Sequence, residues 1–542
     1  MKMVYIIASA LILYTWTPAS AQRWQWAQAG TGISVSSGVA ADASGNAYVT
    51  GHFLGPLRLG SDSVHNSMGP YQEVYLAKYD SLGNTLWTKN MIGYADANGV
   101  ATDAYGHVYI AGTFYSDTLI ADGHALTDPI AGQSNAFVVK YDALGNVIWA
   151  KNLGGTNNDV AVGLCTDPAG NIYVTGSFTG DTLRVDGLTI PHVGNNDGFI
   201  IKLNSAGIAQ WGRSFGAPVS VAASAICADA SGNVFLTGSF SGSYLYTQGA
   251  TLVSSPYTNN VFVVKFDSLG AVDWSRYAGA SGINNTSATA ALAADSAGDV
   301  YVTGYFLDTL WIGSTALRSA GYQNVFTAKY DASGNQLWVK TTGGGYATQT
   351  YGISVDPAGN AFISGYFQYD TLAFAGNVLT SFTGYENTFV AQYDPSGNEM
   401  WAIATATNNN DNTSVASSYA NGNLYITGNF QSFDLTFGNH TLPASEQGFF
   451  LAKVDVSGVP PAGIANTTSA VGIKVFPNPS HGVFYIQGMT EGNSIEVYDL
   501  LGQKVYERDA NVIDLSAKGK GLYFYKISDQ SNIIAQGKLL IK

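Results

Sequence analysis

The residue types that most often perform catalysis are scattered along this chain. The histidines do not cluster, and His107 only replaces the asparagine of a recurring turn; the seven are His52, His65, His107, His124, His192, His440 and His481. The sequence has no His-Glu-x-x-His zinc motif, no clustered Cys and His ligand set and no Gly-x-Ser-x-Gly nucleophile elbow. We therefore predict no catalytic residue, no metal site and no cofactor.

A recurring Asp-x-x-Gly-Asn turn brings carboxylates and amides together at regular spacing, as in Asp42–Asn46. Oxygen-rich turns can bind calcium. These turns lack the alternating carboxylates of calcium loops, whereas Asp can cap a tight turn through its side chain and Gly can supply the positive φ. We expect structural turns.

The only cysteines, Cys165 and Cys227, precede equivalent turns by two residues. Two cysteines do not make a disulfide framework in a secreted chain of this size. Small buried side chains are one interpretation. A bridge between neighbouring repeats is the other, and it requires Cα atoms within about 7 Å.

One phrase, with the pattern Asp-x-x-Gly-Asn-x-Tyr-Val-Thr-Gly, recurs seven times at spacings of 61 to 66 residues. Its copies are Asp42–Phe53, Asp103–Phe114, Asp167–Phe178, Asp229–Phe240, Asp295–Phe306, Asp356–Phe367 and Tyr419–Phe430. A second phrase follows each copy: Ala77–Trp87, Val139–Trp149, Ile201–Trp211, Val264–Trp274, Ala328–Trp338, Ala391–Trp401 and Ala452–Gly458. Each phrase predicts a hairpin, so each repeat predicts four strands, A to D.

Four strands per unit of this length are typical of a β-propeller, because solenoids have shorter periods and sandwiches need about seven strands. The seventh second phrase lacks its tryptophan, but Trp26 stands 16 residues before Asp42, as Trp87 stands before Asp103. We therefore predict an all-β fold with a seven-bladed propeller, closed by an N-terminal strand that completes the last blade.

The region from about residue 23 to 458 resembles the SBBP-type β-propeller repeat family in both phrases, including the Lys-Tyr-Asp-x-x-Gly-Asn-x-x-Trp of the second. The resemblance implies the fold and little about chemistry. Lysines recur in strand C, where pairing with a turn aspartate is expected; they are Lys78, Lys140, Lys202, Lys265 and Lys329, with Gln392 breaking the series.

The first 21 residues have the pattern of a signal peptide, with Lys2, an apolar stretch and cleavage between Ala21 and Gln22. The apolar stretch is too short for a membrane anchor, and we expect no transmembrane segment after its removal. The net charge is −14 and charged residues make up 11% of the chain. This acidity argues against nucleic acid and anionic membranes as partners.

The last residues differ in character from the repeats. We predict a propeller domain over 22–458, a linker over 459–470 and a small antiparallel sandwich, Ig-like, over 471–542. The last part resembles the C-terminal sorting domain of type IX secretion substrates, in residues that include Pro477, Asn478, Pro479, Gly502, Gly521, Lys538 and Lys542. The resemblance implies Sec export, then release or surface attachment through the type IX secretion machinery as partner.

Candidate ligand residues lie in the B–C and D–A connections, which differ between repeats. Amides and carboxylates in the D–A connections are Asp96, Asn98, Asn158, Asp159, Asn285, Gln349, Asn410 and Asp411. Tyrosines in the B–C connections are Tyr244, Tyr246, Tyr257, Tyr322, Tyr369 and Tyr385. Such a surface suits a glycan or protein ligand, although Asn and Gly also serve merely to satisfy loop backbone.

We expect a secreted or cell-surface, non-enzymatic binding or adhesion module, with carbohydrate binding as one form. One alternative is a secreted carbohydrate-active hydrolase or lyase with its site at the mouth of the channel, which requires two carboxylates roughly 5–10 Å apart. The other alternative is a structural component of the envelope.

Overall fold

The chain is all-β in a computed structural model, with no helix among the described residues. These are 24–128, 130, 132–155, 157–194, 196–254, 259–281, 287–319, 322–344, 346–369, 371–374, 376–381, 386–405, 416–432, 435–442, 445–457, 474–476, 480–487, 493–499, 503–508, 511–529 and 532–541. The expected signal peptide and linker lie outside them. The chain forms two compact units, divided between Pro460 and Pro461.

The first unit is built from antiparallel sheets in which strands A to D of a repeat lie in chain order. The first three repeats contain β1 (Trp24–Ala41), β2 (Ala47–Leu59), β4 (Glu73–Tyr79) and β5 (Thr85–Ile92); β6 (Ala95–Thr102), β7 (Val108–Phe114), β10 (Asn135–Tyr141) and β11 (Val147–Asn152); and β12 (Asp159–Thr166), β13 (Ile172–Phe178), β16 (Asp197–Leu203) and β17 (Ala209–Gly216).

The next three repeats contain β18 (Ser220–Ala228), β19 (Val234–Ser241), β22 (Asn259–Phe266) and β23 (Val272–Ser281); β24 (Ser287–Ala294), β25 (Val300–Phe306), β28 (Asn324–Tyr330) and β29 (Gln336–Thr342); and β30 (Ala347–Val355), β31 (Ala361–Gln368), β34 (Glu386–Tyr393) and β35 (Glu399–Ala404). The last repeat has β36 (Ala416–Ala420), β37 (Asn423–Ser432) and β40 (Ser445–Asp455).

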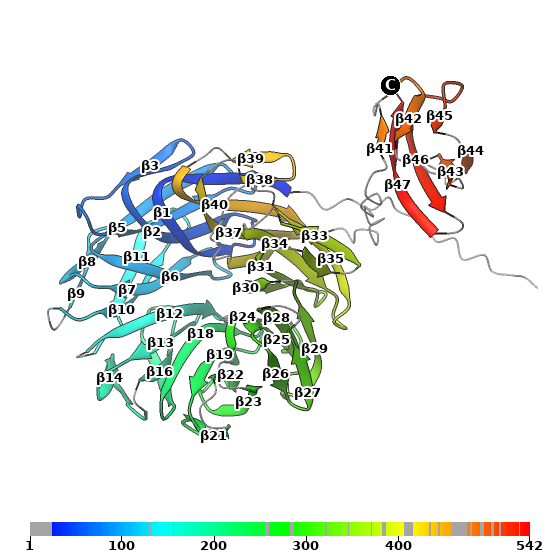
Figure 1. The fold of residues 1–542 in the computed structure, drawn as a ribbon. Coiled ribbons are helices and arrows are strands. Elements are labelled where there is room, and N and C mark those ends of the chain that lie inside the picture. Colours follow the sequence, from blue (N-terminus) through cyan, green and yellow to red (C-terminus); the bar gives the residue numbers. More distant parts are fainter. Residues whose placement is uncertain are drawn as a thin grey trace, which may run out of the picture. The chain divides into compact units, whose positions relative to one another are not determined.

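Strand β1 belongs to the first and the last repeat at once. Its N-terminal part pairs with β40, with Trp26 opposite Lys453, and its C-terminal part pairs with β2. The expected pairing of the Trp26 segment with the last repeat is therefore confirmed. In Figure 1 the blue β1 lies beside the yellow β37 and β40.

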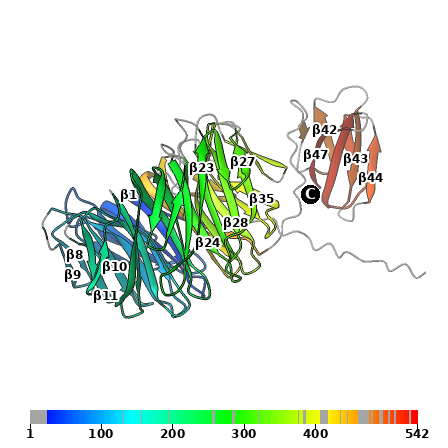
Figure 2. The same ribbon diagram turned by 90° about the horizontal axis from the view of Figure 1, so that it is seen from below.

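Successive repeats pack face to face around a common centre (Figures 1 and 2). Each strand A contacts the strand A of the next repeat, from β1 and β6 onward, and β36 contacts β1 again. Apolar side chains fill the space between consecutive sheets, and one such cluster joins Trp26 and Tyr425 to Val49 and Phe53. The series of contacts between strands A therefore begins at β1, passes through every repeat and ends at β1 again.

The B–C connections were expected to be variable loops, but each forms a short hairpin of its own. The hairpin strands are β3 (Asp62–His65, paired with β2), β8 (Thr118–Ala121) and β9 (His124–Thr127), β14 (Thr182–Val185) and β15 (Leu188–Pro191), β20 (Tyr244–Thr247) and β21 (Ala250–Val253), β26 (Thr309–Ile312) and β27 (Thr315–Arg318), β32 (Thr371–Phe374) and β33 (Asn377–Thr380), and β38 (Leu435–Phe437) and β39 (His440–Leu442). Strand β8 pairs with β5, β20 with β17 and β26 with β23. These hairpins extend strand D of the preceding repeat and shield part of its open edge.

The Asp-x-x-Gly-Asn turns are stabilised by their own aspartates, as expected. Asp229 accepts hydrogen bonds from the backbone N–H of Ser231 and Asn233, both 2.9 Å, and from the Asn233 side chain at 2.7 Å. Gly232 has φ +77°, where a side chain would be strained. The turn's own donors engage both carboxylate oxygens, which supports the structural interpretation over a calcium loop.

Most of the strand C lysines do not bond turn aspartates. Lys202 Nζ and Trp211 Nε1 both donate to the Ser268 carbonyl oxygen of the next repeat, each at 3.1 Å. We call a lysine and a tryptophan that both donate to the same carbonyl oxygen of the next repeat a clamp. It recurs for Lys78, Lys140 and Lys265. Lys329 differs, because it pairs with Asp299 and Asp295 at 3.0 and 3.4 Å.

The same clamp joins the last repeat to the first. Lys453 Nζ and Trp26 Nε1 donate to the Ser81 carbonyl at 2.9 and 3.1 Å. The lysine also lies over the Tyr425 ring, 5.7 Å from its centroid. Trp26 therefore makes the contacts that the strand D tryptophans make elsewhere, although it stands before the first repeat.

The cysteines are both free. Cys165 packs against the apolar cluster between repeats 3 and 4, with Leu236, whereas Cys227 packs against the next cluster along, with Val302. Because the side chains occupy different interfaces, the structure favours small packing residues over a bridge.

The second unit contains two antiparallel sheets. One has the order β41 (Lys474–Phe476), β42 (Val483–Gln487), β45 (Val512–Asp514); the other has β44 (Lys504–Arg508), β43 (Asn493–Tyr498), β46 (Gly521–Asp529), β47 (Asn532–Ile541). Phe484 and Ile513 of the first sheet share an apolar core with Ile495, Ile527 and Leu539 of the second. Figure 2 shows these strands in the second unit.

Two of the expected sorting residues are placed by this arrangement. Gly521 begins β46 opposite Ile541, and Lys538 lies opposite Phe524 in the β46–β47 pair. Pro477, Asn478, Pro479, Gly502 and Lys542 lie outside the described residues, as do Ala21 and Gln22.

Candidate functional site

The candidate site lies on the face where the strands A begin and the strands B end. The D–A connections are shorter than expected there, because Asp96, Asn98, Asp159 and Gln349 are strand residues and not loop residues. The strands A of the first six repeats each have a bulge, which falls at Asn98 in β6 and at Tyr351 in β30. Asp96 and Gln349 both stand two residues before that bulge, so they occupy equivalent positions.

Three tyrosines contact one another where repeats 1 and 2 meet. The ring centroids of Tyr71 and Tyr94 are 5.1 Å apart, and those of Tyr94 and Tyr115 are 4.7 Å apart. Tyr71 and Tyr115 remain 52% and 39% exposed. We call Tyr71, Tyr94 and Tyr115 tyrosine cluster 1.

Polar side chains hold cluster 1 in place. The Tyr115 hydroxyl donates to Asp96 Oδ2 at 3.2 Å, Gln72 Nε2 donates to Asp96 Oδ1, and His52 Nδ1 lies 3.0 Å from Asp96 Oδ1. Burial pushes the pKa of Asp96 up, but these partners outweigh it and hold the pKa below its ordinary value. Burial and the Asp96 charge raise the pKa of Tyr115 to about 12, so its hydroxyl stays a donor.

A second set of three tyrosines occupies the equivalent positions where repeats 5 and 6 meet. The centroids of Tyr322 and Tyr346 are 5.6 Å apart, with the rings stacked, and those of Tyr346 and Tyr369 are 5.0 Å apart. Their exposed fractions are 57%, 47% and 56%. Tyr322, Tyr346 and Tyr369 are tyrosine cluster 2.

The correspondence between the clusters extends to the backbone. Tyr71 and Tyr322 stand two residues before a strand C, Tyr94 and Tyr346 directly precede a strand A, and Tyr115 and Tyr369 directly follow a strand B. The backbone hydrogen bonds differ, because the Tyr94 carbonyl accepts the Tyr115 N–H and the Tyr346 carbonyl accepts the N–H of Tyr322, the counterpart of Tyr71, both at 2.8 Å. The placement of the three tyrosines relative to the strands is therefore what the two clusters share.

Amides replace the charged groups beside cluster 2. Gln349 Nε2 donates to Gln323 Oε1 at 2.6 Å, and the Tyr351 hydroxyl donates to Gln349 Oε1 at 2.7 Å. Tyr351 stacks on Tyr366 with centroids 6.1 Å apart. Burial raises the pKa of the nearby Glu386. Burial, together with the charges of Tyr305 and Glu386, raises the pKa of Tyr351 to about 12.

The other predicted residues mostly support the backbone. Asn98 Nδ2 donates to the Ala161 carbonyl of the next strand A at 2.7 Å, and Asn158 Oδ1 accepts the Ser134 N–H at 3.0 Å. Asp159 is 2% exposed and accepts the Gly155 N–H. Burial raises the pKa of Asp159 to about 7, because this one hydrogen bond does not compensate for lost solvation.

The remaining predicted residues are dispersed or outside the described part of the chain. Tyr244 and Tyr246 are exposed on β20, away from both clusters in the sequence. Asn285, Asn410, Asp411, Tyr257 and Tyr385 lie outside the described residues.

Sequence reasoning missed most of both clusters. It identified Tyr322 and Tyr369 as B–C tyrosines, but not Tyr71, Tyr94, Tyr115 or Tyr346. A signal was available: among the D–A connections, only Tyr94-Ala95 and Tyr346-Ala347 place a tyrosine directly before a strand A.

A second missed feature is a series of buried polar residues where strand C begins. They pair with the recurring phenylalanine of strand B and are Glu73, Asn135, Asp197, Asn260, Asn324 and Asn387. Glu73, for example, accepts hydrogen bonds from Ser67 and Asn90. Glu73 thereby joins Ser67 of the B–C connection to Asn90 of strand D.

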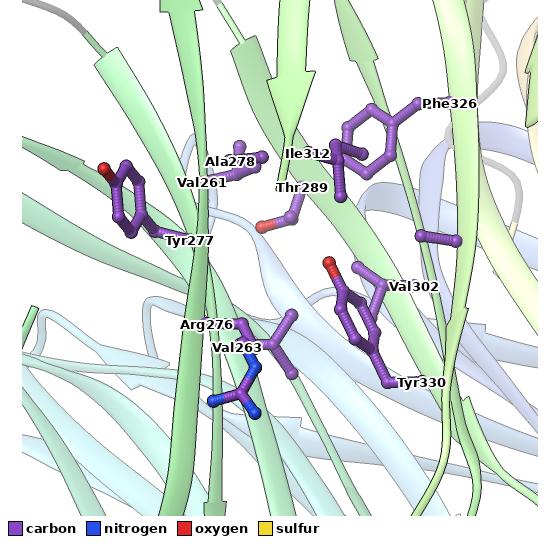
Figure 3. Close-up of a pocket in the computed structure, with 11 residues that line it drawn as sticks. Val261, Val263, Arg276, Tyr277, Ala278, Thr289, Val302, Ile312, Phe326 and Tyr330 are labelled. Atoms are coloured by element: carbon purple, nitrogen blue, oxygen red, sulfur yellow. The ribbon is translucent and has the colours of Figure 1, made fainter. Parts of the chain in front are cut away.

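A cavity between repeats 4 and 5 offers no ligand site. It has a volume of about 10 Å³, room for about one water molecule. Its lining is mostly apolar, with Val261, Val302 and Phe326, and Figure 3 shows the hydroxyls of Thr289 and Tyr330 pointing into the same space. The described residues contain no group of three or more His, Cys, Asp or Glu able to hold a metal ion, and they form no helix that could cross a bilayer.

Comparison with known families identifies two segments. Residues 474–542 match the family described as secretion system C-terminal sorting domain, and residues 148–181 match the beta-propeller repeat family SBBP. The chain is thus a protein with β-propeller repeats and a type IX sorting domain. The sorting domain indicates export by type IX secretion to the cell surface or the medium, and it implies contact with that machinery.

Similar whole proteins are distant. An uncharacterized WD repeat-containing protein of Acanthamoeba polyphaga mimivirus is 23% identical over 418 residues, which cover 61% of this chain and 30% of that protein. A quinohemoprotein alcohol dehydrogenase from Comamonas testosteroni is 9% identical, with a TM-score of 0.37 and coverage of 85% and 79%. An endosialidase of phage phi92 is 10% identical, with a TM-score of 0.34 and coverage of 96% and 85%. At these levels of similarity no activity is transferred to this chain.

Proposed function

We propose that this chain is an exported, non-enzymatic binding or adhesion module whose ligand face carries the two tyrosine clusters. The proposed scaffold is a seven-bladed β-propeller over 22–458, closed by β1, joined through a linker over 459–470 to an Ig-like sorting domain over 471–542. The continuous contacts from β1 through the strands A back to β1 support this closure. The clamp of Lys453 and Trp26 on Ser81 supports it independently.

The duplication of the tyrosine cluster is the observation that carries the proposal. Single exposed apolar residues are common on protein surfaces, but contiguous exposed aromatic groups mark interaction sites. Two such groups occur at equivalent positions, each with half-exposed rings and fixed polar neighbours. Preorganised side chains of this kind lose little conformational freedom when a ligand binds.

The alternatives are less well supported. A hydrolase or lyase needs paired carboxylates, whereas Asp96 and Glu386 belong to separate networks in repeats 2 and 6. A structural envelope component would need no exposed aromatic clusters on the face whose connections vary.

A binding screen tests the proposal. The exported full-length chain is immobilised and exposed to panels of polysaccharides, extracellular-matrix proteins and peptides. We expect at least one ligand that binds wild type and loses binding in a variant with Tyr94→Ala and Tyr346→Ala together. A ligand unaffected by that variant, or no ligand in any panel, would contradict the proposal.

A further inference from the structure

We infer that the two tyrosine clusters are a pair of equivalent subsites for an uncharged polysaccharide, which binds to both at once. This inference rests on the proposed binding function and adds the ligand class and the number of sites.

Each cluster offers exposed aromatic rings that contact one another. The three rings come from two consecutive repeats and contact one another at 4.7–5.1 Å in cluster 1 and 5.0–5.6 Å in cluster 2. Aromatic faces carry partial negative charge and attract the weakly positive C–H groups of an apolar surface. The flat C–H faces of sugar rings match this surface, whereas a deep pocket would favour a compact ligand.

Hydrogen-bonding groups lie beside the rings in fixed positions. Cluster 1 has Asp96 with Gln72 and His52, and cluster 2 has Gln349 with Gln323 and the Tyr351 hydroxyl. Carboxylate and amide groups are suited to bidentate hydrogen bonds with neighbouring hydroxyls. Among the described residues, no lysine or arginine hydrogen-bonds to either group, and the chain carries a net charge of −14. An anionic polymer is therefore disfavoured, and uncharged sugars are favoured.

The position of the clusters favours a long ligand. Cluster 1 stands at the start of β6 and cluster 2 at the start of β30, and Figure 1 shows these inner strands on opposite sides of the centre. A polymer that reaches from one cluster to the other gains from effective concentration, which raises avidity by about 10²–10⁴ over a single site. A short oligosaccharide fills each cluster separately and gains nothing from the pairing.

The test combines oligosaccharide stoichiometry with polymer affinity. The exported full-length chain is titrated calorimetrically with hexasaccharides of uncharged glucans and mannans, and polymer binding is measured by affinity electrophoresis. Variant 1 carries Tyr94→Ala and Tyr115→Ala, variant 2 carries Tyr346→Ala and Tyr369→Ala, and a third variant carries all four. A matched control carries Tyr244→Ala and Tyr246→Ala, which removes two exposed tyrosines outside the clusters.

We expect two hexasaccharides per wild-type chain, one for variant 1 or variant 2, and none for the fourfold variant. Polymer affinity should fall about 100-fold when either cluster is lost, and the control should match wild type. Tyr94→Phe, which keeps the ring, should retain binding, and unchanged melting temperatures exclude misfolding as the cause.

Three results would overturn the inference. One hexasaccharide per wild-type chain, or full polymer affinity in variant 1 or variant 2, would remove the paired sites. Binding of alginate or of peptides through the tyrosines, without any uncharged glycan, would replace the ligand class while the proposed binding function stands. No binding to any probe would contradict the proposed function itself.

Discussion

The two sides of the repeat unit differ in how they use the repeated sequence. On the side of the A–B and C–D turns, the same aspartate, glycine, lysine and tryptophan recur and make the same contacts in most repeats, as at Asp229 and in the Trp211 clamp. On the opposite side, the connections change, and exposed tyrosine clusters form at only two of the described junctions. The constant side therefore holds the sheets together, and the variable side is free to acquire a ligand.

Loss of a clamp should have the largest effect on the free energy of unfolding. It tests whether the junction between the last and the first repeat contributes as much stability as a junction between inner repeats. We expect Trp26→Ala to lower the free energy of unfolding by about 3–5 kcal/mol, the cost of removing a buried aromatic side chain. Trp274→Ala is the matched control, because Trp26 is 9% exposed, Trp274 is 7% exposed and both donate to a carbonyl of the following sheet. Urea unfolding measures both. A loss below about 1 kcal/mol for Trp26 alone would separate the closing junction from the rest.

The next largest effect concerns the pH dependence of stability, which depends on a buried carboxylate on the variable side. Asp159 has a pKa near 7 in the folded chain and an ordinary value near 3.8 when unfolded. The folded chain therefore binds the extra proton between about pH 4 and 7, and the free energy of unfolding falls as pH rises through that window. Asp159→Asn should abolish this slope and be more stable than wild type at pH 8, by roughly 4 kcal/mol. If the melting temperatures of wild type and Asp159→Asn changed with pH in parallel from pH 4 to 8, the raised pKa of Asp159 would be refuted.

A turn aspartate on the constant side should have a smaller effect. Asp229→Ala leaves three donors of its turn without their partner, and we expect a loss of about 2 kcal/mol in the free energy of unfolding. Asp229→Asn keeps one oxygen and should lose less. Chemical denaturation of the two variants decides the point, and equal stability of Asp229→Ala and wild type would show that the turn needs no side-chain cap.

The smallest expected effect on stability lies in the tyrosine clusters themselves. Tyr346→Ala removes a ring that is 47% exposed, so we expect the free energy of unfolding to change by less than about 1 kcal/mol. Thermal melting checks this prediction. A loss of several kcal/mol would mean that cluster 2 is part of the framework, and the contrast between the two sides would disappear.

The local elements were predictable from the sequence because each is encoded within a short segment. Asp-x-x-Gly-Asn specifies its hairpin locally, and the spacing from Trp26 to Asp42 matches that of the inner repeats, so the pairing of Trp26 with Lys453 could be predicted. The hairpins that extend the preceding sheet could not, because they join residues of different repeats, such as Met91 and Ala121.

The candidate site was less predictable for the same physical reason. Tyr71, Tyr94 and Tyr115 come from three separate segments and meet only after two sheets have packed. The sequence pointed to Asp96 and Gln349 through their variable connections, but not to their equivalence, which depends on the bulges at Asn98 and Tyr351.

The pairing of β1 with β40 is the contact on which the proposed closed scaffold and its proposed ligand face depend. Ala27 lies opposite Ala452 in this pair, as Ala150 lies opposite Val139 within repeat 2. Directly opposed Cα atoms lie about 4.5–5.5 Å apart, within the range that a disulfide spans. With Cys165 and Cys227 replaced by alanine, Ala27→Cys and Ala452→Cys should oxidise to a bond as fully as the control Val139→Cys and Ala150→Cys, seen as loss of the thiols that react with a maleimide-coupled polyethylene glycol in the unfolded, unreduced chain. A bond in the control with none between positions 27 and 452 would contradict the account.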